Sequence, residues 1–276
     1  MSTTSILSGS PKEIAVSTVE ELRRAIESEE LVLHYQPIVN LADGTLTGFE
    51  ALVRWRHPRL GLLCAEAFVP LAEDCGLIRP LDEWVLRTAS RQLAAWQEDV
   101  LVAPGFRMAV NVSAIEMDGD GLVERVRDAI GASGVDACGL VVEVTETSNI
   151  ESLESAKRSA DGLHGLGVEL ALDDFGSRYG TFSLLSSLPF DVLKIDREFV
   201  VQTNSDHGRA IVSALIDLGD RLGARVIAEG IETAEQAAQL RALGSHEGQG
   251  FFWAPALSLE DAEAVLTTGR WPNSGG

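Results

Sequence analysis

Acidic and amide side chains recur along this chain directly after short apolar runs, where they could gather into one reactive site. Glu143 follows Leu140-Val141-Val142, and Glu229 follows Val226-Ile227-Ala228. With Lys194, with Glu50 inside its run and with Gln249 opening the last run, the series comprises Glu50, Asn111, Glu143, Glu146, Asp173, Asp174, Lys194, Asp196, Glu229, Glu232 and Gln249. A single residue of this kind is usually a helix cap or a solvated strand end. Its repetition after six runs favours a shared role.

The residue types in this series indicate metal chemistry. Carboxylates gathered on one rim repel one another, and their pKa values rise unless cations neutralise them. Oxygen ligands without histidine or cysteine favour hard ions, which predicts Mg²⁺ or Mn²⁺. The adjacent Asp173 and Asp174 could bridge two ions about 3.5 to 4 Å apart, an arrangement suited to phosphodiester hydrolysis. Lys194 should be buried only beside acidic partners, where it could hold or deprotonate a water.

The spacing of the apolar runs predicts the elements that position these residues. Strands are expected at 32–38, 46–55, 107–112, 140–145, 169–173, 191–195, 225–228 and 248–252. Helices are expected at 81–96, 118–130, 152–166, 206–222, 234–243 and 259–267. Residues 40–44 are too few for a crossover helix, so the first two strands should be antiparallel. This alternation predicts an α/β fold, a TIM-like (β/α)8 barrel with an antiparallel first strand, whose C-terminal rim would collect the polar residues.

Length and composition set the domain organisation and location that we expect. A chain of 276 residues with 45% hydrophobic residues can bury one barrel core or two smaller ones. We expect a flexible leader at 1–16, a single barrel domain at 17–270 and a flexible tail at 271–276. No apolar stretch is long enough to span a bilayer, and the N-terminus lacks a secretion signal. A cytoplasmic protein without membrane contact is therefore predicted.

Charge and motif content exclude several other classes. The formal charge of -20 disfavours binding to a nucleic-acid polymer. The three cysteines lack CxxC spacing and the five histidines are dispersed, so neither a disulfide framework nor a zinc site is expected. The sequence also lacks a P-loop, an HExxH motif and a complete dinucleotide-binding fingerprint.

Eight ordered motifs resemble the EAL-domain family of cyclic di-GMP phosphodiesterases, over about residues 18–268. They are Tyr35-Gln36-Pro37-Ile38, Glu50-Ala51-Leu52-Val53-Arg54-Trp55, Asn111-Val112-Ser113, Glu143-Val144-Thr145-Glu146, Asp173-Asp174-Phe175-Gly176, Leu193-Lys194-Ile195-Asp196, Ala228-Glu229-Gly230-Ile231-Glu232-Thr233 and Gln249-Gly250-Phe251. The resemblance implies a TIM-like barrel and a metal-dependent hydrolase that converts cyclic di-GMP to linear pGpG. It also implies two Mg²⁺ or Mn²⁺ ions per active site and a role in bacterial second-messenger signalling.

The same resemblance implies a role for each matching residue. One metal ion is expected on Glu50, Asn111, Glu143 and Asp173. The second ion is expected on Asp173, Asp174 and Glu229. The implied catalytic set, in which Lys194 positions the nucleophilic water, is Glu50, Lys194, Glu229 and Gln249. Substrate contacts are expected from Gln36, Leu52 and the phosphate-binding Arg54. Glu146 resembles the residue that anchors the loop after Asp174.

One departure from the family pattern keeps a second function open. Arg178 stands where the family has a glycine, in the loop that is associated with metal binding and dimer contacts. A catalytically weak cyclic di-GMP receptor that acts through a partner protein is therefore the alternative. We expect a homodimer, and control by a separate regulatory protein stays open. A glycosidase or enolase-like barrel is a third reading, but a glycosidase needs only one carboxylate pair and leaves the other acids unexplained.

Overall fold

The computed structural model describes residues 19–99, 101–113, 117, 121–145, 152–176 and 181–271. The predicted leader lies outside these residues, as do Glu146, Arg178 and residues 272–276. Trp271, the first residue of the predicted tail, is partly buried and packs against the apolar core. Among the described residues, no helix combines the length and the apolar character that a membrane crossing requires.

Eight strands close into a barrel, which confirms the predicted fold class. They are β1 (Leu31–Asn40), β2 (Leu46–His57), β4 (Arg107–Asn111), β5 (Leu140–Thr145), β6 (Glu169–Phe175), β7 (Val192–Ile195), β8 (Arg225–Ala228) and β9 (Glu247–Gln249). The β1 strand pairs antiparallel with both β2 and β9, and this closes the ring. All other neighbours in the barrel, from β2 round to β9, pair in parallel.

One additional strand, β3 (Gly61–Cys64), was not among the predicted elements. It pairs antiparallel with the end of β2 and lies at the edge of the sheet, outside the barrel. The turn between β2 and β3 is held by His57, whose buried ring accepts hydrogen bonds at Nδ1 from the backbone N–H groups of Arg59 and Leu60. This hairpin extends β2 beyond the barrel wall.

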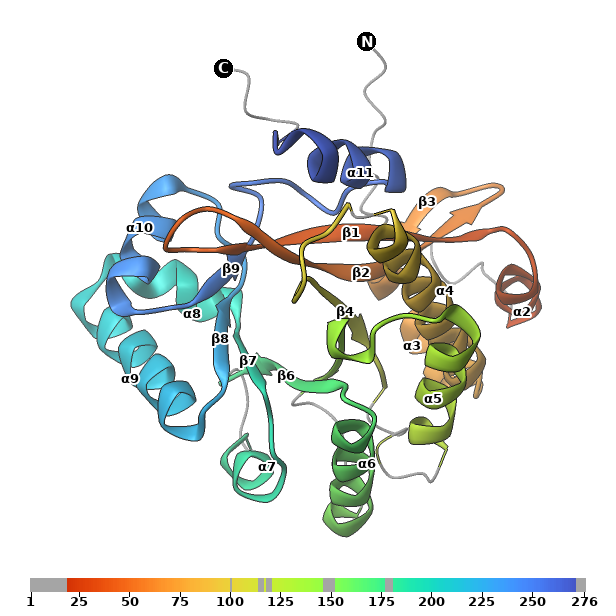
Figure 1. Ribbon diagram of the computed structural model, residues 1–276, viewed down its shortest axis with the longest axis horizontal. Helices are drawn as coiled ribbons and strands as arrows, with labels where there is room; N and C mark the ends of the chain where they lie inside the picture. The colour runs from red at the N-terminus through yellow and green to blue at the C-terminus, as the bar shows by residue number, and fades with distance from the viewer. Residues whose placement is uncertain are drawn as a thin grey trace.

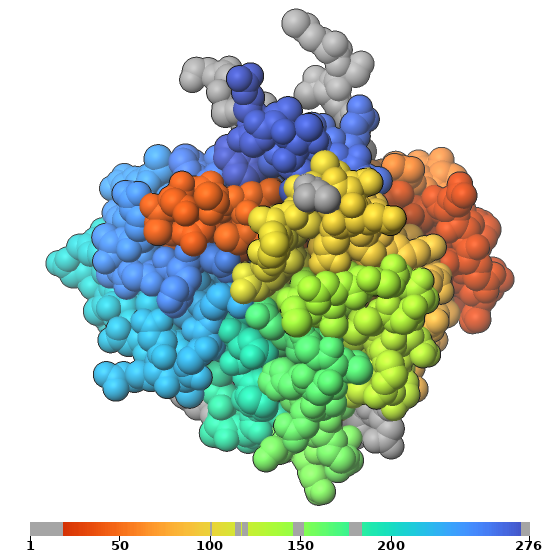
Figure 2. Space-filling model, viewed as in Figure 1, coloured from red at the N-terminus to blue at the C-terminus, as the bar shows by residue number. Residues whose placement is uncertain are grey.

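Helices surround the ring of strands (Figure 1). They are α2 (Val19–Glu27), α3 (Val69–Asp74), α4 (Ile78–Glu98), α5 (Leu122–Ser133), α6 (Leu153–Gly165), α7 (Thr181–Ser187), α8 (Arg197–Val201), α9 (Asp206–Leu222), α10 (Ala234–Leu243) and α11 (Leu259–Thr268). Within the described parts of the chain, the connections include three short 3-10 turns: η1 (Ala65–Ala67), η3 (Ala137–Gly139) and η4 (Gln202–Asn204). In the space-filling view, helices and loops hide most of the strands (Figure 2).

Local capping explains why several helix starts agreed with expectation. Ser152, Ser205, Thr233 and Ser258 each precede a helix and accept a hydrogen bond from a backbone N–H of its first turn. The bounds of α9 and α10 match the prediction at both ends. The short helices α3, α7 and α8 were not predicted, because segments of five to seven residues carry too little apolar periodicity.

The last strand differs from its prediction. The expected span was 248–252, whereas β9 covers Glu247–Gln249, so that Gln249 closes the strand. Immediately afterwards the backbone of Gly250 packs so closely on Ile231 that an added Cβ would lie 2.1 Å from the Ile231 carbonyl oxygen. Ile231 also bonds the backbone on both sides, donating to Gln249 and accepting from Phe252. These contacts turn the chain away from the sheet.

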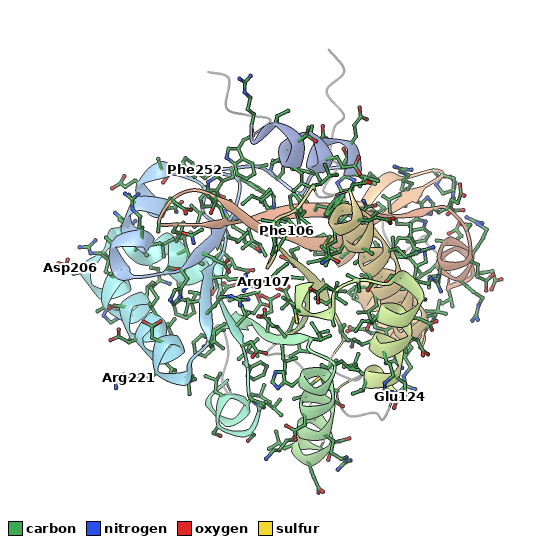
Figure 3. All side chains as sticks on the ribbon, viewed as in Figure 1. Phe106, Arg107, Glu124, Asp206, Arg221 and Phe252 are labelled. Atoms are coloured by element: carbon green, nitrogen blue, oxygen red, sulfur yellow. The ribbon has the colours of Figure 1, made fainter. Side chains whose placement is uncertain are left out.

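Three layers of side chains fill the barrel interior, because residues two positions apart on a strand point the same way. The layer at the strand starts is charged: Arg225 donates to Glu169 at 2.7 and 2.9 Å, and Arg107 donates to the same carboxylate at 3.2 Å. Figure 3 shows Arg107 near the middle of the ring. The second layer is apolar and contains Ile38, Ala109, Val141, Ala171, Val192 and Ile227. The third layer, at the strand ends, holds the predicted site.

The outer side of β1 and β2 rests on an aromatic cluster. Phe49 is fully buried, and its ring centroid lies 5.5 Å from that of Trp96 on α4 and 5.6 Å from that of Phe106. Tyr35 on β1 closes the cluster, with its ring centroid 5.1 Å from that of Trp96. These contacts fix α4 against the two strands that carry Gln36 and Glu50.

Phe49→Ala should lower the free energy of unfolding by about 3 to 5 kcal/mol, because it leaves a cavity between β2 and α4. Phe49→Leu keeps most of the volume and should lower it by less than about 2 kcal/mol. Urea denaturation followed by tryptophan fluorescence measures both changes. Equal losses for the two variants would contradict a tightly packed cluster.

Candidate active site

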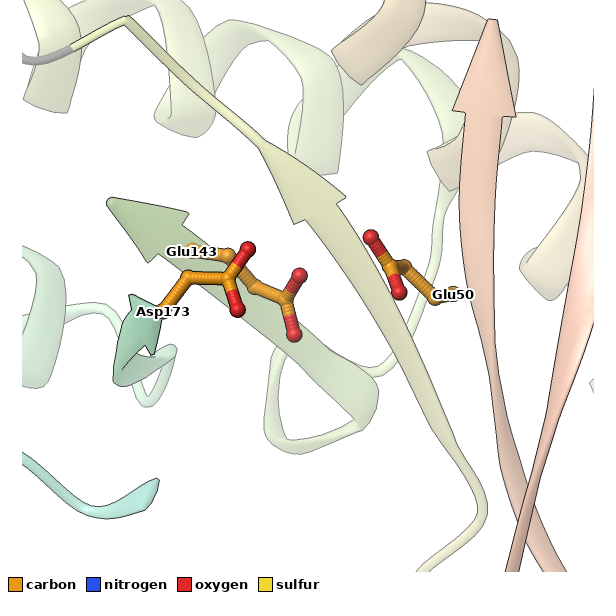
Figure 4. A group of neighbouring side chains, drawn as sticks. All are labelled: Glu50, Glu143 and Asp173. Atoms are coloured by element: carbon orange, nitrogen blue, oxygen red, sulfur yellow. The ribbon is translucent and has the colours of Figure 1, made fainter. Parts of the chain in front are cut away.

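The predicted polar residues converge at the C-terminal ends of the barrel strands. Glu50 on β2, Glu143 on β5 and Asp173 on β6 point toward one another (Figure 4). One oxygen of each lies within 4.8 Å of the others, and the same holds for a second group made of Asp173, Asp174 and Glu229. These acids come from four strands and form one cluster around the shared Asp173. Glu50 and Glu229, the two most distant in sequence, are 179 positions apart.

Lys194 lies between the two groups and contacts both. Its Nζ is 2.8 Å from carboxylate oxygens of Glu143 and Glu229, 3.2 Å from Glu50 and 3.3 Å from Asp173. The side chain is 1% exposed, so these contacts replace the water that its ammonium group loses on burial. The prediction that Lys194 is buried only beside acidic partners is confirmed.

Two amides complete the packing around Glu50. Asn111, the last residue of β4, donates from Nδ2 to Glu50 Oε1 at 2.7 Å. Gln249, the last residue of β9, donates from Nε2 to Glu50 Oε2 and to Glu229 Oε1, both at 2.8 Å. Both oxygens of Glu50 therefore accept hydrogen bonds, and its side chain has one orientation.

A local irregularity allows Asp173 and Asp174 to share a site. Adjacent residues of a regular strand point to opposite faces of the sheet. Here the β6–β7 register shifts between Leu172 and Phe175, and Asp174 adopts a φ of 56°, a left-handed conformation that Asp tolerates better than most residues. The backbone N–H of Asp174 donates to Asp173 Oδ1 at 2.9 Å. The bulge thus brings both carboxylates into one cluster.

Burial and mutual repulsion perturb the acids. Burial raises the pKa values of Glu143 and Glu229 well above the usual value, with Lys194 opposing the effect, and it raises the pKa of Asp173 in the same way. Burial and the neighbouring Asp173 raise the pKa of Asp174 to about 6. Glu50 behaves differently: burial favours its neutral form, yet Lys194 and the two amides lower its pKa. Burial also opposes the charge of Lys194, but the surrounding acids raise its pKa well above the usual value.

The donor set fits two hard divalent cations. Glu143 Oε1 is buried and has no hydrogen-bond partner among the described residues, so it has an unused lone pair inside the cluster. Five carboxylates and one ammonium give a formal charge of -4 when all are ionised, which equals in magnitude the charge of two divalent cations. All the acidic donors are oxygens, the ligands that Mg²⁺ and Mn²⁺ prefer.

The predicted substrate-binding residues lie on β1 and β2 beside this cluster. Gln36 on β1 pairs in register with Glu50, and its Nε2 donates to the carbonyl oxygen of Ala254 at 2.7 Å. Leu52 and Arg54 follow Glu50 at intervals of two along β2, both partly buried. Of two other acids of the rim, Asp196 also acts on the cluster, because in addition to burial and Asp173 its charge and a side-chain hydrogen bond raise the pKa of Asp174. Asp196 caps α8, and Glu232 forms a 2.7 Å ion pair with Arg197.

Asp82 supports the site and was not singled out from the sequence. It is 6% exposed on α4, and its Oδ2 accepts the backbone N–H of Ser113 at 2.9 Å, two residues after Asn111. The sequence does contain a sign that Asp82 is buried, because this charged residue falls within the apolar stripe of α4. Ile78, Leu81 and Val85 are its neighbours on the buried face of the helix. The contact holds the chain segment that leaves β4.

Comparison with known protein families accounts for the site and the barrel together. Residues 19–256 match the family model described as the EAL domain, which is most of the chain. The chain belongs to the EAL domain family. The resemblance inferred from eight sequence motifs is confirmed.

Two relatives of this EAL domain have names that state an activity on cyclic di-GMP. It is 40% identical over 253 residues, 91% of this chain, to the cyclic di-GMP phosphodiesterase NbdA of Pseudomonas aeruginosa. It is 40% identical over 249 residues, 90% of this chain, to the bifunctional diguanylate cyclase/cyclic di-GMP phosphodiesterase MucR of the same organism. The chain spans 32% of the length of the first relative and 36% of the second.

The fold of this EAL domain also matches a solved structure. The PaMucR phosphodiesterase in complex with c-di-GMP aligns with a TM-score of 0.82 at 38% sequence identity. The alignment covers 88% of this chain and 98% of that chain. The barrel described above is therefore shared with that structure over most of both chains.

Mg²⁺ or Mn²⁺ should raise the melting temperature of this EAL domain. A ligand that binds only the folded state at about 100 times its dissociation constant adds about 2.7 kcal/mol, or roughly 5 to 10 °C for a domain of this size. Differential scanning fluorimetry with and without chelator measures the shift. NaCl at matched ionic strength is the control, and Asp174→Asn should reduce the shift. An equal shift with NaCl would count against a cation site.

Asp82→Asn should change how stability depends on pH. Burial raises the pKa of Asp82 to about 7, although the Ser113 N–H opposes this. Because the unfolded value is about 3.9, the folded protein binds the extra proton between about pH 4 and 7, and the free energy of unfolding falls as the pH rises through that window.

The amide variant keeps an acceptor for Ser113 but does not titrate. As the pH rises from 4 to 8, the free energy of unfolding of Asp82→Asn should therefore increase relative to that of the native protein by roughly 1 to 3 kcal/mol. Urea denaturation at a series of pH values measures this difference. Asp128→Asn, on an exposed position of α5, is the matched control. A stability difference that does not vary with pH would refute the assignment.

Proposed function

We propose that this EAL domain hydrolyses cyclic di-GMP to linear pGpG with two divalent cations at the acidic cluster. The observation that carries the proposal is the cluster itself, in which two groups of carboxylates share Asp173. The similarity to proteins named as cyclic di-GMP phosphodiesterases, and to a structure in complex with c-di-GMP, supports the choice of substrate.

The cation-binding residues follow from the two groups. Glu50, Asn111, Glu143 and Asp173 would hold one ion, and Asp173, Asp174 and Glu229 would hold the other. Asn111 uses Nδ2 to bond Glu50, which leaves its Oδ1 for a cation. When bound, such ions neutralise charge on a phosphodiester and lower the pKa of a water molecule. Mg²⁺ and Mn²⁺ are the ions that we propose.

Lys194 and Gln249 orient the groups that react. Because four carboxylates surround Nζ and raise its pKa, Lys194 is an ammonium that donates hydrogen bonds. With its protons directed at oxygen acceptors, it can hold a water for in-line attack on phosphorus. Of the two roles expected for this lysine, positioning is therefore the one we propose. Gln249 joins Glu50 and Glu229 and so keeps the two sides of the cluster in register.

Substrate binding is assigned to the strands that lead out of the cluster. Arg54 lies four residues beyond Glu50 on the same face of β2, where its guanidinium group suits a phosphate. Leu52 lies between them and offers an apolar contact to a base. Gln36 is buried beside Glu50 and is held by the Ala254 carbonyl. The homodimer, a separate regulatory protein and the cytoplasmic location remain predictions from the sequence.

Glu50→Ala should lower hydrolysis of cyclic di-GMP to below about a tenth of the native rate, a change of at least about 1.4 kcal/mol in the barrier. The reason is the loss of one cation ligand and of the acceptor for Lys194, Asn111 and Gln249. The measurement is chromatographic detection of pGpG with Mg²⁺ or Mn²⁺. Circular dichroism checks that the variant is folded.

Glu124→Ala, at an exposed position of α5, is the matched control and should keep native activity. Retained activity in Glu50→Ala would contradict the assigned role. Tight binding of cyclic di-GMP by the native protein without release of pGpG, with either ion, would reject hydrolysis and favour the receptor alternative.

A further inference from the structure

The paired strands β1 and β2 carry one half-exposed face outward from the acidic cluster. The register pairs Gln36 with Glu50 inside the cluster, then His34 with Leu52, then Val32 with Arg54. We call Val32, His34, Leu52 and Arg54 the open ribbon face. All four are partly exposed, whereas the intervening residues on the opposite face, Leu33, Tyr35, Val53 and Trp55, are buried.

His34 lies in the middle of the open ribbon face and has no role in the proposed chemistry. Its cross-strand partner is Leu52, and its neighbour along β1 on the same face is Gln36. The charge of Arg54 acts on its imidazole ring. Two residues assigned to substrate binding therefore adjoin His34: Gln36 on the same strand and Leu52 on the paired strand.

The imidazole is held by the chain segment that follows β9. Nδ1 of His34 lies 3.3 Å from the carbonyl oxygen of Ala256, and Nε2 of Gln36 lies 2.7 Å from that of Ala254. A carbonyl only accepts, so the hydrogen bond requires a proton on Nδ1. One segment thus fixes two neighbouring polar side chains of β1.

The protonation state of the ring follows from its surroundings. Burial lowers the pKa of His34; the bond to Ala256 opposes this, and the positive charges of Arg54 and Arg56 add to the lowering. The ring is therefore neutral at pH 7, with its single proton on Nδ1. Nε2 is left with a lone pair, which makes it a hydrogen-bond acceptor.

We propose that His34 is a specificity-determining residue whose Nε2 accepts a hydrogen bond from a nucleoside N–H or O–H group lying on the open ribbon face. This inference rests on the proposed function and adds a recognition contact to it. The donors that a guanosine offers are the N1–H and 2-amino group of the base and the 2′-hydroxyl of the ribose. The face separates this contact from the reacting phosphate, which lies at the cluster.

The test compares native protein, His34→Leu and His34→Gln. Leucine removes the acceptor, so KM for cyclic di-GMP and the dissociation constant from calorimetry should rise about 3- to 10-fold, the effect of one hydrogen bond, with kcat within about 2-fold. Glutamine has both a donor for Ala256 and an acceptor, and it should restore most of the affinity. His207→Leu, at an exposed position of α9, is the matched control.

Two analogues identify the donor. If His34 reads the 2-amino group, the inosine analogue of the cyclic dinucleotide should bind native and His34→Leu proteins equally. If His34 accepts from the ribose 2′-hydroxyl, the 2′-deoxy analogue should bind the native and His34→Leu proteins equally. If both analogues still separate the two proteins, the donor is the N1–H group.

Two outcomes would overturn the inference. The first is an unchanged KM and dissociation constant in His34→Leu. The second is an equal loss of activity on bis(p-nitrophenyl) phosphate, which has no nucleoside and reports only on the cluster. Failure of the proposed function is seen separately, as native protein that releases no pGpG, and in that case calorimetry still tests His34.

Discussion

A buried ion pair network around Lys194 is the constraint on which the rest of the structure depends. An ammonium group that is 1% exposed is stable only if acceptors replace its water, and here they come from Glu50, Glu143, Asp173 and Glu229. Each acceptor belongs to a different strand or strand end. The lysine is therefore satisfied only when the barrel is closed, so folding and assembly of the site are coupled. The same network still has more negative than positive charge, which is why cations are expected to complete it.

The layered interior of the barrel explains how such a cluster can form without unfolding the protein. Apolar residues of the second layer, such as Val141 and Ile227, separate the acids of the third layer from the charged residues at the strand starts. In that first layer Glu169 is neutralised by Arg107 and Arg225, which lower its pKa against the effect of burial. Charge is thus balanced internally at one end of the barrel and left unbalanced at the other. The unbalanced end is where an EAL domain is proposed to act.

The antiparallel start of the barrel gives this rim its asymmetry. Because β1 runs against its neighbours, the chain passes Val32 and His34 before it reaches Gln36 beside the cluster. The β2–β3 hairpin extends the same ribbon past the barrel wall. The proposed substrate, with a reactive phosphate and two nucleosides, would need a surface of this kind beside the acidic cluster. The formal charge of -20 repels an anionic ligand over most of the surface, so a local positive charge such as that of Arg54 is needed to attract it.

Much of the fold and most of the site were determined by local sequence patterns. Apolar runs of the right length, most of them ending in a polar residue, predicted the barrel, the convergence of Glu50, Glu143, Asp173 and Glu229, and the acidic partners of a buried Lys194. Other features depended on contacts between distant segments. The close approach of Gly250 to Ile231 ends β9, the bulge at Asp174 turns its carboxylate beside Asp173, and Ser113 explains the buried Asp82. The neighbours of a residue in sequence determine whether it favours a strand or a helix. Only the closed barrel brings distant backbone groups close enough to contact its side chain, and these contacts set the direction in which the side chain points.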